Sequence, residues 1–354
     1  MNRNCIEIDG SMGEGGGQVL RASLALSMST GRPFHIRNIR SGRPKPGLKR
    51  QHLTCVLAAA EISGAQTSGA EPGSTELRFA PGPVRSGEYS FDVGSGGSCT
   101  LVLQAIIPPL LTAPGPSRIT VSGGTHVPHA PVFEFMQQTL FPRLEKLGPK
   151  LSARMDRAGF MQVGGGRITV NIEPVSELAP VFETETEQDD ITGTKADIYL
   201  ANLDPGIAAR EMEVLLAKDY TSLGLRAESI ARHSTSRRRG PEGPGNAVLV
   251  TVQRSSGATV CSEIGWRGRS AEVVAGQAAL RAIYFMKSGA PVDQFLADQL
   301  LVPLALAGGG SFVTEKVSLH AETCMALLPL FTPIRATVER DGRKNQRIEL
   351  RPAG

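Results

Sequence analysis

Near its start the chain reads Gly10-Ser-Met-Gly-Glu-Gly-Gly-Gly-Gln-Val-Leu-Arg21, a glycine-rich loop that runs directly into an apolar, helix-like pattern. Part of this stretch, Gly13-Glu-Gly-Gly-Gly-Gln-Val-Leu20, is echoed about 80 residues later by Gly94-Ser-Gly-Gly-Ser-Cys-Thr-Leu101. Self-similarity at a fixed spacing is the signature of a fold built from copies of one unit. The sequence therefore predicts a repeated architecture.

The segments that follow each glycine loop come in the same order. Each loop precedes a helix-like run, a short strand, a second helix-like run and an alternating strand. These segments are 18–30, 34–39, 47–63 and 76–79 in the first copy, and 98–113, 118–122, 131–147 and 167–172 in the second. The shared order predicts two copies of one α/β unit.

The remainder of the chain suggests a third unit and an insertion. The predicted third unit begins with two helical patterns, at 270–287 and 293–307. A strand at 311–317, a helix at 320–330 and strands at 334–340 and 346–350 follow in the same unit. Residues 183–192 are acidic and polar, as in a linker. A helix at 208–223 and strands at 225–231, 247–253 and 258–265 come next. We predict an α/β protein with a large repeat-built domain, 1–183 and 268–354, and a small inserted α/β domain, 184–267.

Composition limits the class of protein. The chain has 354 residues, of which 40% are hydrophobic and 20% charged, which is typical of a globular protein. Its five cysteines form no CxxC pair, which argues against a disulfide framework or a zinc site. No secretory leader opens the sequence, and no run reaches the ~18 apolar residues of a membrane helix. We expect a cytoplasmic protein with no membrane partner.

The opening loop has features of a phosphate site. Glycines let backbone N–H groups approach an anion closely, and the following helix adds the positive end of its dipole. Glu14 is the lone acid among these amides, and a divalent metal would need such a ligand. The loop is not a Walker A motif, and Gln18 stands where a dinucleotide fingerprint has its third glycine. A tight turn with an exposed glutamate remains the alternative.

Net charge is only +4, but basic residues are concentrated in two places. Residues 32–50 contain seven arginines and lysines and no acid: Arg32, Arg37, Arg40, Arg43, Lys45, Lys49 and Arg50. Such a block attracts phosphates or polyanions, although a solubilising loop is the alternative. For the second run, Arg237-Arg238-Arg239, a solvated loop is the favoured interpretation.

Two later segments carry chemistry-bearing side chains. Phe295-Leu-Ala-Asp-Gln299 places an aromatic ring, an acid and an amide on one helical run, so Asp298 could join Glu14 around a metal. His320 follows a strand and begins a helix, where it can be a nucleophile, a general base or a structural residue. Cys324 lies one helical turn further on and raises a Cys–His alternative without a visible third group.

The segment Thr125-His-Val-Pro-His-Ala-Pro131 contains a His-x-x-His pair. Two histidines at this spacing can bind a metal only with further ligands. For His126 and His129 we therefore expect a turn or the wall of a pocket.

Taken together, these motifs resemble the RNA 3′-terminal phosphate cyclase family. The resemblance runs nearly end to end, from Ile6 to the segment at His320. It rests on the opening loop, on Arg40-Ser-Gly-Arg-Pro-Lys-Pro-Gly-Leu-Lys-Arg-Gln-His52, on Gly123-Gly-Thr-His126, on Phe295-Leu-Ala-Asp-Gln299 and on His320-Ala-Glu-Thr323.

The resemblance implies an ATP-dependent reaction at an RNA 3′-phosphate end. A histidine, here His320, attacks the α-phosphate of ATP to give a covalent enzyme–AMP and pyrophosphate. AMP then passes to the RNA 3′-phosphate, and the neighbouring 2′-OH expels AMP to leave a 2′,3′-cyclic phosphate. The resemblance also implies a cofactor, Mg²⁺ or Mn²⁺, held by Glu14 and Asp298.

The resemblance also assigns binding residues. Gln104, Pro131, Phe295, Leu296, Ala297, Asp298 and Gln299 match the nucleotide-binding positions. Phe295 stands where relatives often have tyrosine, so the stacking face is kept and a hydroxyl is lost. Around the phosphates and the RNA end, the matching residues are Arg21, Arg40, Arg43 and Gln51.

The family fold is a large domain of three repeated units, each resembling the C-terminal domain of translation initiation factor three, with a smaller inserted domain. Family habit also suggests a homodimer. Two rivals remain. One is a non-catalytic, cyclase-like factor of ribosomal RNA processing. Proteins of that type differ from the cyclases at the histidine and at the nucleotide-binding segment. The other is an enolpyruvyl transferase on a similar scaffold, which needs no histidine nucleophile.

Overall fold

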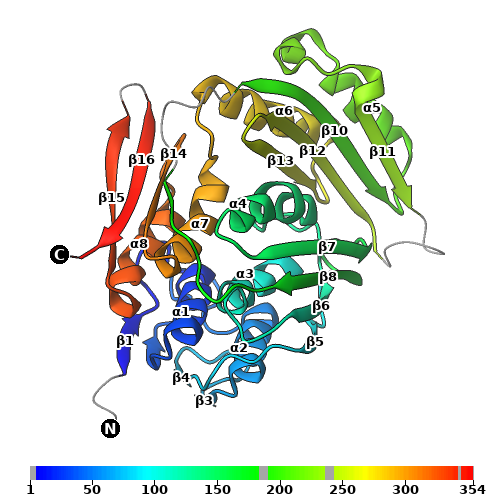
Figure 1. The fold of residues 1–354 in the computed structure, drawn as a ribbon. Helices are drawn as coiled ribbons and strands as arrows, with labels where there is room; N and C mark the ends of the chain where they lie inside the picture. Colours follow the sequence, from blue (N-terminus) through cyan, green and yellow to red (C-terminus); the bar gives the residue numbers. More distant parts are fainter. Residues whose placement is uncertain (1–4, 183–189, 236–242, 342–343, 354) are drawn as a thin grey trace.

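The chain forms four four-stranded sheets, of which three surround a central group of helices and the fourth carries helices on its own outer face (Figure 1). The computed structural model describes residues 5–182, 190–235, 243–341 and 344–353. Within them the mixed α/β class predicted from the sequence is confirmed. Three of the sheets share one topology.

The first unit contains the opening glycine loop. Its elements are β1 (Ile6–Asp9), α1 (Gly17–Thr30), β2 (Phe34–Arg37), α2 (Arg50–Ser63), β3 (Gln66–Ser68) and β4 (Leu77–Ala80). The strand order is β1-β2-β4-β3, with β1 and β2 parallel and the other two pairs antiparallel. Parallel neighbours need a crossover, and α1 supplies it.

The second unit repeats this pattern. Its elements are β5 (Glu88–Asp92), α3 (Cys99–Leu110), β6 (Ser117–Gly123), a π-helical segment (Phe135–Leu140) leading into α4 (Phe141–Glu145), β7 (Lys150–Arg157) and β8 (Gly166–Glu173). The order β5-β6-β8-β7 again begins with one parallel pair. The predicted repeat is therefore present in the folded chain.

The third unit is divided by the insertion. Its elements are β9 (Val181–Phe182), α7 (Gln294–Leu306), β14 (Gly310–Thr314), α8 (Leu319–Phe331), β15 (Ile334–Asp341) and β16 (Asn345–Pro352). The order β9-β14-β16-β15 matches the other two units, with β9 and β14 parallel. The insertion therefore lies between the first strand and the first helix of the third copy.

The inserted segment forms the fourth sheet. Its elements are β10 (Ile191–Ala201), α5 (Gly206–Leu215), 3₁₀ turns at Lys218–Leu223 and Ala227–Ser229, β11 (Ile230–Thr235), β12 (Gly245–Arg254), β13 (Gly257–Gly265) and α6 (Ala271–Ser288). This sheet, ordered β11-β10-β12-β13, has a hydrophobic core of its own under α5 and α6.

The sequence analysis misassigned several segments here. The helix expected at 270–287 as part of the third unit is α6, which packs against β12 and β13 of the small sheet. Strand β10 was missed because the acidic residues before it hid its start. The predicted boundaries at 184 and 268 stay predictions, and the first of these lies at 183–189, outside the described residues, as does the basic run 237–239.

Helix α1 occupies the centre of the large assembly. It packs against α2, α3, α7 and α8, and its residues from Gln18 to Met28 are all buried. A helix that is buried on every side is apolar nearly all round, and the larger polar exceptions in α1, Gln18 and Arg21, are hydrogen-bonded to each other. These two residues line a pocket together with residues of α3 and α7, so the first turn of α1 faces the other units.

The glycine loop before α1 is fixed by its contact with α8. Gly13 has φ +57°, and a Cβ placed there would lie 1.9 Å from Oγ1 and 2.9 Å from Cβ of Thr323. In addition, the Glu14 amide donates to Thr323 Oγ1 at 3.2 Å. Glycine is required here for both the backbone conformation and the close approach.

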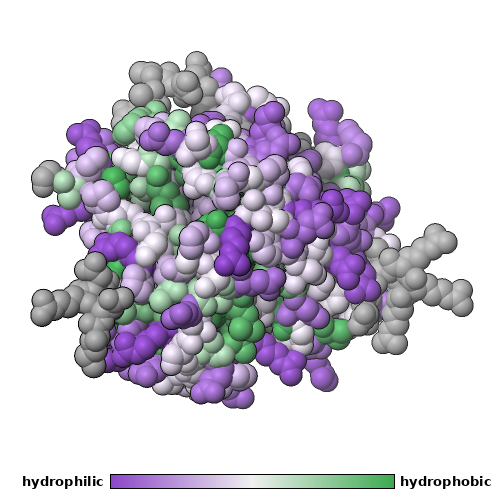
Figure 2. Space-filling model, turned by 60° about the horizontal axis from the view of Figure 1, so that its bottom comes forward, coloured by the Kyte–Doolittle hydropathy of each residue, from purple (hydrophilic) through white to green (hydrophobic). Residues whose placement is uncertain are grey.

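Among the described residues, no helix is long and apolar enough to cross a membrane. Figure 2 shows one face, on which apolar residues lie in separate patches between hydrophilic ones. The predicted cytoplasmic location stays a prediction.

Replacing Gly13 with alanine should destabilise the protein strongly. The substitution adds a steric clash with Thr323 to the strain of a positive φ, so we expect a loss of more than about 2 kcal/mol in the free energy of unfolding. Gly31→Ala is the matched control, because Gly31 has φ +69° but nothing within 4 Å of the added Cβ. It should lose only about 1 kcal/mol. Equal losses in chemical denaturation would contradict the role of the α8 contact.

Glu211 gives the small domain a predictable pH dependence. This carboxyl is fully buried on α5, accepts one hydrogen bond from Asn246 Nδ2 at 3.1 Å, and burial raises its pKa to about 7. Between pH ~4.5 and ~7 the folded state therefore holds a proton that the unfolded state has released. The free energy of unfolding should fall by up to about 3 kcal/mol as pH rises through this window.

Glu211→Gln should remove this pH dependence, whereas Glu213→Gln, on the exposed side of the same helix, should retain it. Urea denaturation at pH 5 and pH 8 measures the difference between the variants. A Glu211→Gln profile parallel to that of wild type would show that the titration of this carboxyl does not affect folding.

Candidate active site

Glu14 occupies the N-terminus of α1. Its carboxylate accepts the backbone N–H of Gln18 at 3.2 Å and pairs with the guanidinium of Arg43. A Cβ at Gly16 would lie 2.3 Å from Oε1 of Glu14, so a glycine is needed beside this side chain. The loop therefore holds its own anion at the positive end of the helix. The alternative of an exposed glutamate is wrong, because only 6% of the side chain is accessible.

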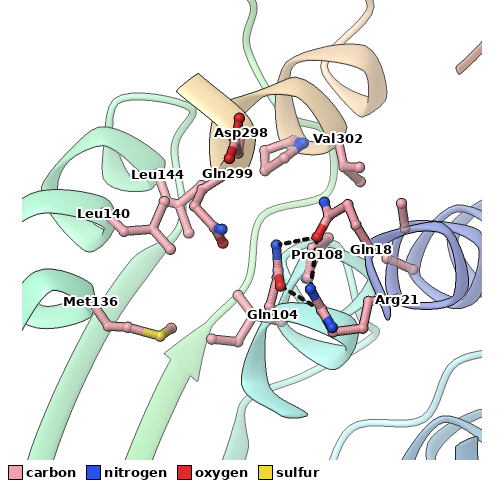
Figure 3. A pocket seen from close by; sticks show the side chains of 14 residues that line it. Gln18, Arg21, Gln104, Pro108, Met136, Leu140, Leu144, Asp298, Gln299 and Val302 are labelled. Carbon is pink, nitrogen blue, oxygen red and sulfur yellow. Dashed lines mark hydrogen bonds between the residues drawn. The ribbon is translucent and has the colours of Figure 1, made fainter. Parts of the chain in front are cut away.

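Arg21 lies one turn further along α1 and is held by two glutamines. Its Nε donates to Gln104 Oε1 at 2.8 Å, and its Nη2 donates to Gln18 Oε1 at 2.9 Å. Figure 3 shows these three side chains together, with Asp298 and Gln299 of α7 at the same pocket. Arg21 is almost fully buried, so its charge acts in a medium that screens it weakly.

The basic segment 40–50 of the sequence, called the basic loop below, serves two different purposes in the structure. Arg43 reaches Glu14, but Arg40 turns inward and donates from Nη1 to the carbonyls of Lys45 and Gly47, both at 2.8 Å. Arg40 is buried and thus stiffens the loop. Gln51, at the start of α2, accepts the backbone N–H of Ser98 at 2.7 Å and so fixes the start of α3.

His52 adds an uncharged group next to Arg21. A Cβ at Gly17 would lie 2.6 Å from both Arg21 Nη1 and His52 Nε2, which shows how closely these groups meet. Burial, followed by the charges of Arg21 and Arg40, lowers the pKa of His52 to about 3. The imidazole is neutral at physiological pH and does not add to the positive charge there.

Asp298 lies on α7 beside the start of α8. Its Oδ1 accepts the hydroxyl of Ser318, which is also the N-cap of α8 and accepts the amide of Ala321 at 3.0 Å. Burial is the main reason that the pKa of Asp298 rises to about 7, and Glu14 adds to the rise.

His320 stands in the first turn of α8, directly after Ser318 and Leu319. Burial lowers its pKa, nearby Glu14 opposes that shift, and Arg21 and Arg43 reinforce it. These three charged groups come from the opening loop, α1 and the basic loop, so the structure brings together residues that the sequence separates by about 300 positions. A half-buried, neutral imidazole at the edge of a cavity is chemically competent as a nucleophile.

The cavity at His320 has a volume of about 460 Å³, within the range of small-molecule sites. Its walls come from α1, α3, the loop 127–131, α7 and the end of the small sheet. Predicted site residues on these walls are Arg21, Gln104, Pro131, Phe295, Asp298, Gln299 and His320. The ring of Phe295 is half exposed, and the guanidinium of Arg281 lies 5.7 Å from its centre.

Two predicted nucleotide contacts differ from the rest. The side chains of Leu296 and Ala297 are buried in the core and do not line this cavity. Both sit at the start of α7, where Asp293 caps the amide of Leu296 at 2.8 Å. Any contact of these two residues with a nucleotide would involve their backbone.

Some contributors were missed by the sequence analysis. Gln18 bonds to Arg21, Ser318 bonds to Asp298, and Thr323 bonds to the glycine loop. The insertion also contributes to the cavity wall, through Trp266, Arg269 and Arg281. Gln18 alone had a sequence signal, since it interrupts the glycine run. The others act through contacts between units that no local pattern reports.

The His-x-x-His pair is not a metal site. His126 is fully buried, its Nε2 bonds Glu134 at 2.9 Å and its Nδ1 bonds Thr125 at 2.8 Å. His129 has φ +61° and lines the cavity, as the pocket-wall interpretation predicted. Within the described part of the chain, no group of three or more His, Cys, Asp or Glu side chains is arranged to hold a metal.

Comparison with known proteins identifies the family. Residues 12–338 match the family model described as RNA 3′-terminal phosphate cyclase. The chain belongs to the RNA 3′-terminal phosphate cyclase family. It is similar to a protein of that name from Koribacter versatilis, at 46% identity over 96% of this chain and 93% of the relative. A second, from Ralstonia nicotianae, is 43% identical over 95% of this chain and 94% of its own length.

The Cys–His alternative predicts that Cys324 is reactive, whereas the structure makes it inert. Cys324 is fully buried, and burial raises its thiol pKa to about 12. We therefore expect that iodoacetamide leaves it unmodified in the native protein and that Cys324→Ala costs only about 1 kcal/mol of stability. Mass spectrometry of the alkylated native protein tests this. Labelling at Cys324 faster than at the partly exposed Cys5 would overturn it.

Proposed function

We propose that this protein is an ATP-dependent RNA 3′-phosphate cyclase that works through a covalent histidine–AMP. The observation that carries the proposal is the position of His320 on the wall of a cavity that also contains Arg21, Gln104, Asp298 and Phe295. Membership of the family supports the same activity. The non-catalytic alternative is not favoured, because both the histidine and the Asp298-Gln299 segment are present.

In the first step His320 attacks the α-phosphorus of ATP. A P–N bond forms, the bond to the β-phosphate oxygen breaks, and pyrophosphate leaves. The attack needs a neutral imidazole, and the burial of His320 together with Arg21 and Arg43 favours that form. The same arginines stabilise the charge that develops on the phosphates.

The cavity residues suit an adenine nucleotide. Phe295 and Pro131 offer flat apolar surfaces for a purine, and Gln104 and Gln299 offer amides for polar edges. Arg21 is already oriented by Gln18 and Gln104, so little entropy is lost when it meets a phosphate. Arg43 would exchange its partner Glu14 for a phosphate oxygen.

In the second step an oxygen of the RNA 3′-phosphate attacks the phosphorus of the bound AMP, and the P–N bond to His320 breaks. The ribose 2′-OH then attacks the terminal phosphate, expels AMP and closes the 2′,3′-cyclic phosphodiester. Arg40 lies on the same loop as Arg43, and Gln51 lies in the first turn of α2, which follows that loop. We assign both residues to the RNA end. For Arg40 that role is the support of the loop, since its guanidinium is buried.

Glu14 and Asp298 are the residues that would hold a divalent cation. Both are oxygen donors of the kind that Mg²⁺ and Mn²⁺ prefer, and their carboxyl groups are held in place by Arg43 and by the hydroxyl of Ser318. Such an ion would neutralise negative charge on the ATP phosphates when bound. Two carboxylates leave room for water and phosphate oxygens in its coordination shell.

That the protein forms a homodimer stays a prediction.

Incubation with [α-³²P]ATP and Mg²⁺ should label the wild-type protein with a bond that is labile in acid and stable in alkali, as expected of a phosphoramidate. His320→Ala should reduce the label by more than about 10³-fold, because the nucleophile is removed. The label is measured after denaturing electrophoresis.

His129→Ala is the matched control, since His129 is another histidine on the cavity wall. It should still form the covalent label. Wild type that binds ATP but stays unlabelled would refute the covalent mechanism. Wild type that is labelled but leaves a 3′-phosphorylated oligoribonucleotide uncyclised would refute the substrate assignment alone.

A further inference from the structure

A second cavity adjoins the first, between the second unit and the inserted domain. Its volume is about 430 Å³. It is lined by the loop Phe160–Gln162, by Leu203, Ile207 and Arg210 around the start of α5, and by the segment from Ile264 to Ala271. Ile264, Trp266 and Arg269 line both cavities, so the two are continuous along one wall.

The lining of the second cavity combines positive charge with exposed apolar surface. It contains Arg210, Arg267 and Arg269, and no Asp or Glu is among the described residues that line it. Arg210 forms an exposed ion pair with Glu272 at 3.3 Å, which is easily exchanged. Arg267 is exposed. This chemistry matches a polyanion that also carries flat, apolar groups.

Trp266 is the feature that distinguishes the cavity from a plain basic groove. The guanidinium of Arg269 lies 4.2 Å from the centre of its ring, while 42% of the residue remains exposed. Arg269 is itself fixed by Glu263 and by a bond to the Ile264 carbonyl at 3.2 Å. The indole is therefore held in place before any ligand arrives, which lowers the entropic cost of stacking on it.

The opposite wall is equally fixed. A Cβ at Gly245 would lie 1.9 Å from the ring of Phe160, so β12 and this ring are in close contact. Met161 and Leu203 are each more than one-third exposed beside it. The cavity is thus bounded by two rigid elements and presents apolar side chains to whatever enters.

We propose that this second cavity binds the nucleotides on the 5′ side of the RNA terminal phosphate, with a base stacked on Trp266 and backbone phosphates at Arg267 and Arg210. The inference rests on the proposed function, which puts the terminal phosphate near His320 in the first cavity. The strand must leave that cavity, and the shared wall at Trp266 leads into a basic, aromatic surface. Stacking and charge together are how proteins bind single strands without reading sequence.

The chain contains one tryptophan, so Trp266 is a built-in probe. Its fluorescence should be quenched by 3′-phosphorylated RNA oligomers of three to six nucleotides, added without ATP, and much less by a nucleoside 3′-monophosphate. Trp266→Ala should weaken oligomer binding, measured by anisotropy of a 5′-labelled RNA, by at least about 5-fold. Trp266→Phe should restore most of it, because a stacking face is retained.

Arg267→Gln separates this site from the adenylylation site. It should weaken oligomer binding several-fold and flatten its dependence on salt, while the covalent label from ATP forms as in wild type. Arg226→Gln is the matched control, since Arg226 is an exposed arginine of the inserted domain outside both cavities. It should leave RNA binding unchanged.

The outcomes distinguish the two proposals. If wild type binds and cyclises RNA but the Trp266 and Arg267 variants match it, the strand leaves by another path and this inference is wrong. If ATP quenches Trp266 and oligomers add nothing, the second cavity belongs to the nucleotide. If wild type is adenylylated but binds no 3′-phosphorylated RNA, the proposed substrate fails together with this inference.

Discussion

The site depends on the close approach of the glycine loop to helix α8. No side chain separates Gly13 from Thr323, so the amide of Glu14 bonds to α8 one turn away from His320. This contact joins residues 309 positions apart and closes the first unit onto the third. The buried α1 follows directly from the loop, so the same contact sets the position of Arg21. A glycine here is therefore a requirement of assembly as much as of local backbone geometry.

Most of the large domain could be predicted because its signals are local or repeated. Apolar periodicity identified the helices that became α1, α2, α3, α7 and α8, and the echo of the glycine loop identified the duplication. The third copy was harder to identify because its first strand, β9, has two residues and is followed by the insertion. Helix α6 has ordinary amphipathic spacing, and nothing in that spacing says which of two sheets it covers.

The site was predictable to the extent that each residue type has a chemical reason to be there. Glu14 was singled out from its loop, whereas the roles of Arg21 and His320 came from the resemblance to the cyclase family. The structure places Glu14 and Arg21 close enough to His320 for their charges to shift its pKa. Arg40 shows where that reasoning stops, since an arginine in a basic loop was expected to face phosphate and instead bonds two carbonyls of its own loop. Ser318 could not be found from sequence, because its importance lies in a hydrogen bond to Asp298 on another helix.

The insertion completes the cavity, which explains why it sits where it does in the third unit. It leaves the repeat after β9 and returns into α7, the helix that carries Phe295 and Asp298. The C-terminal end of the insertion therefore leads directly into a helix that borders the cavity, and its residues Trp266, Arg269 and Arg281 contribute to the cavity wall. One face of the small sheet packs on the second unit, where Ala247, Leu249 and Val260 join the core of the large domain and Phe160 contacts Gly245. Placing Trp266 and the arginines on that wall leaves His320 on the repeat-built domain while the insertion shapes the cavity in front of it.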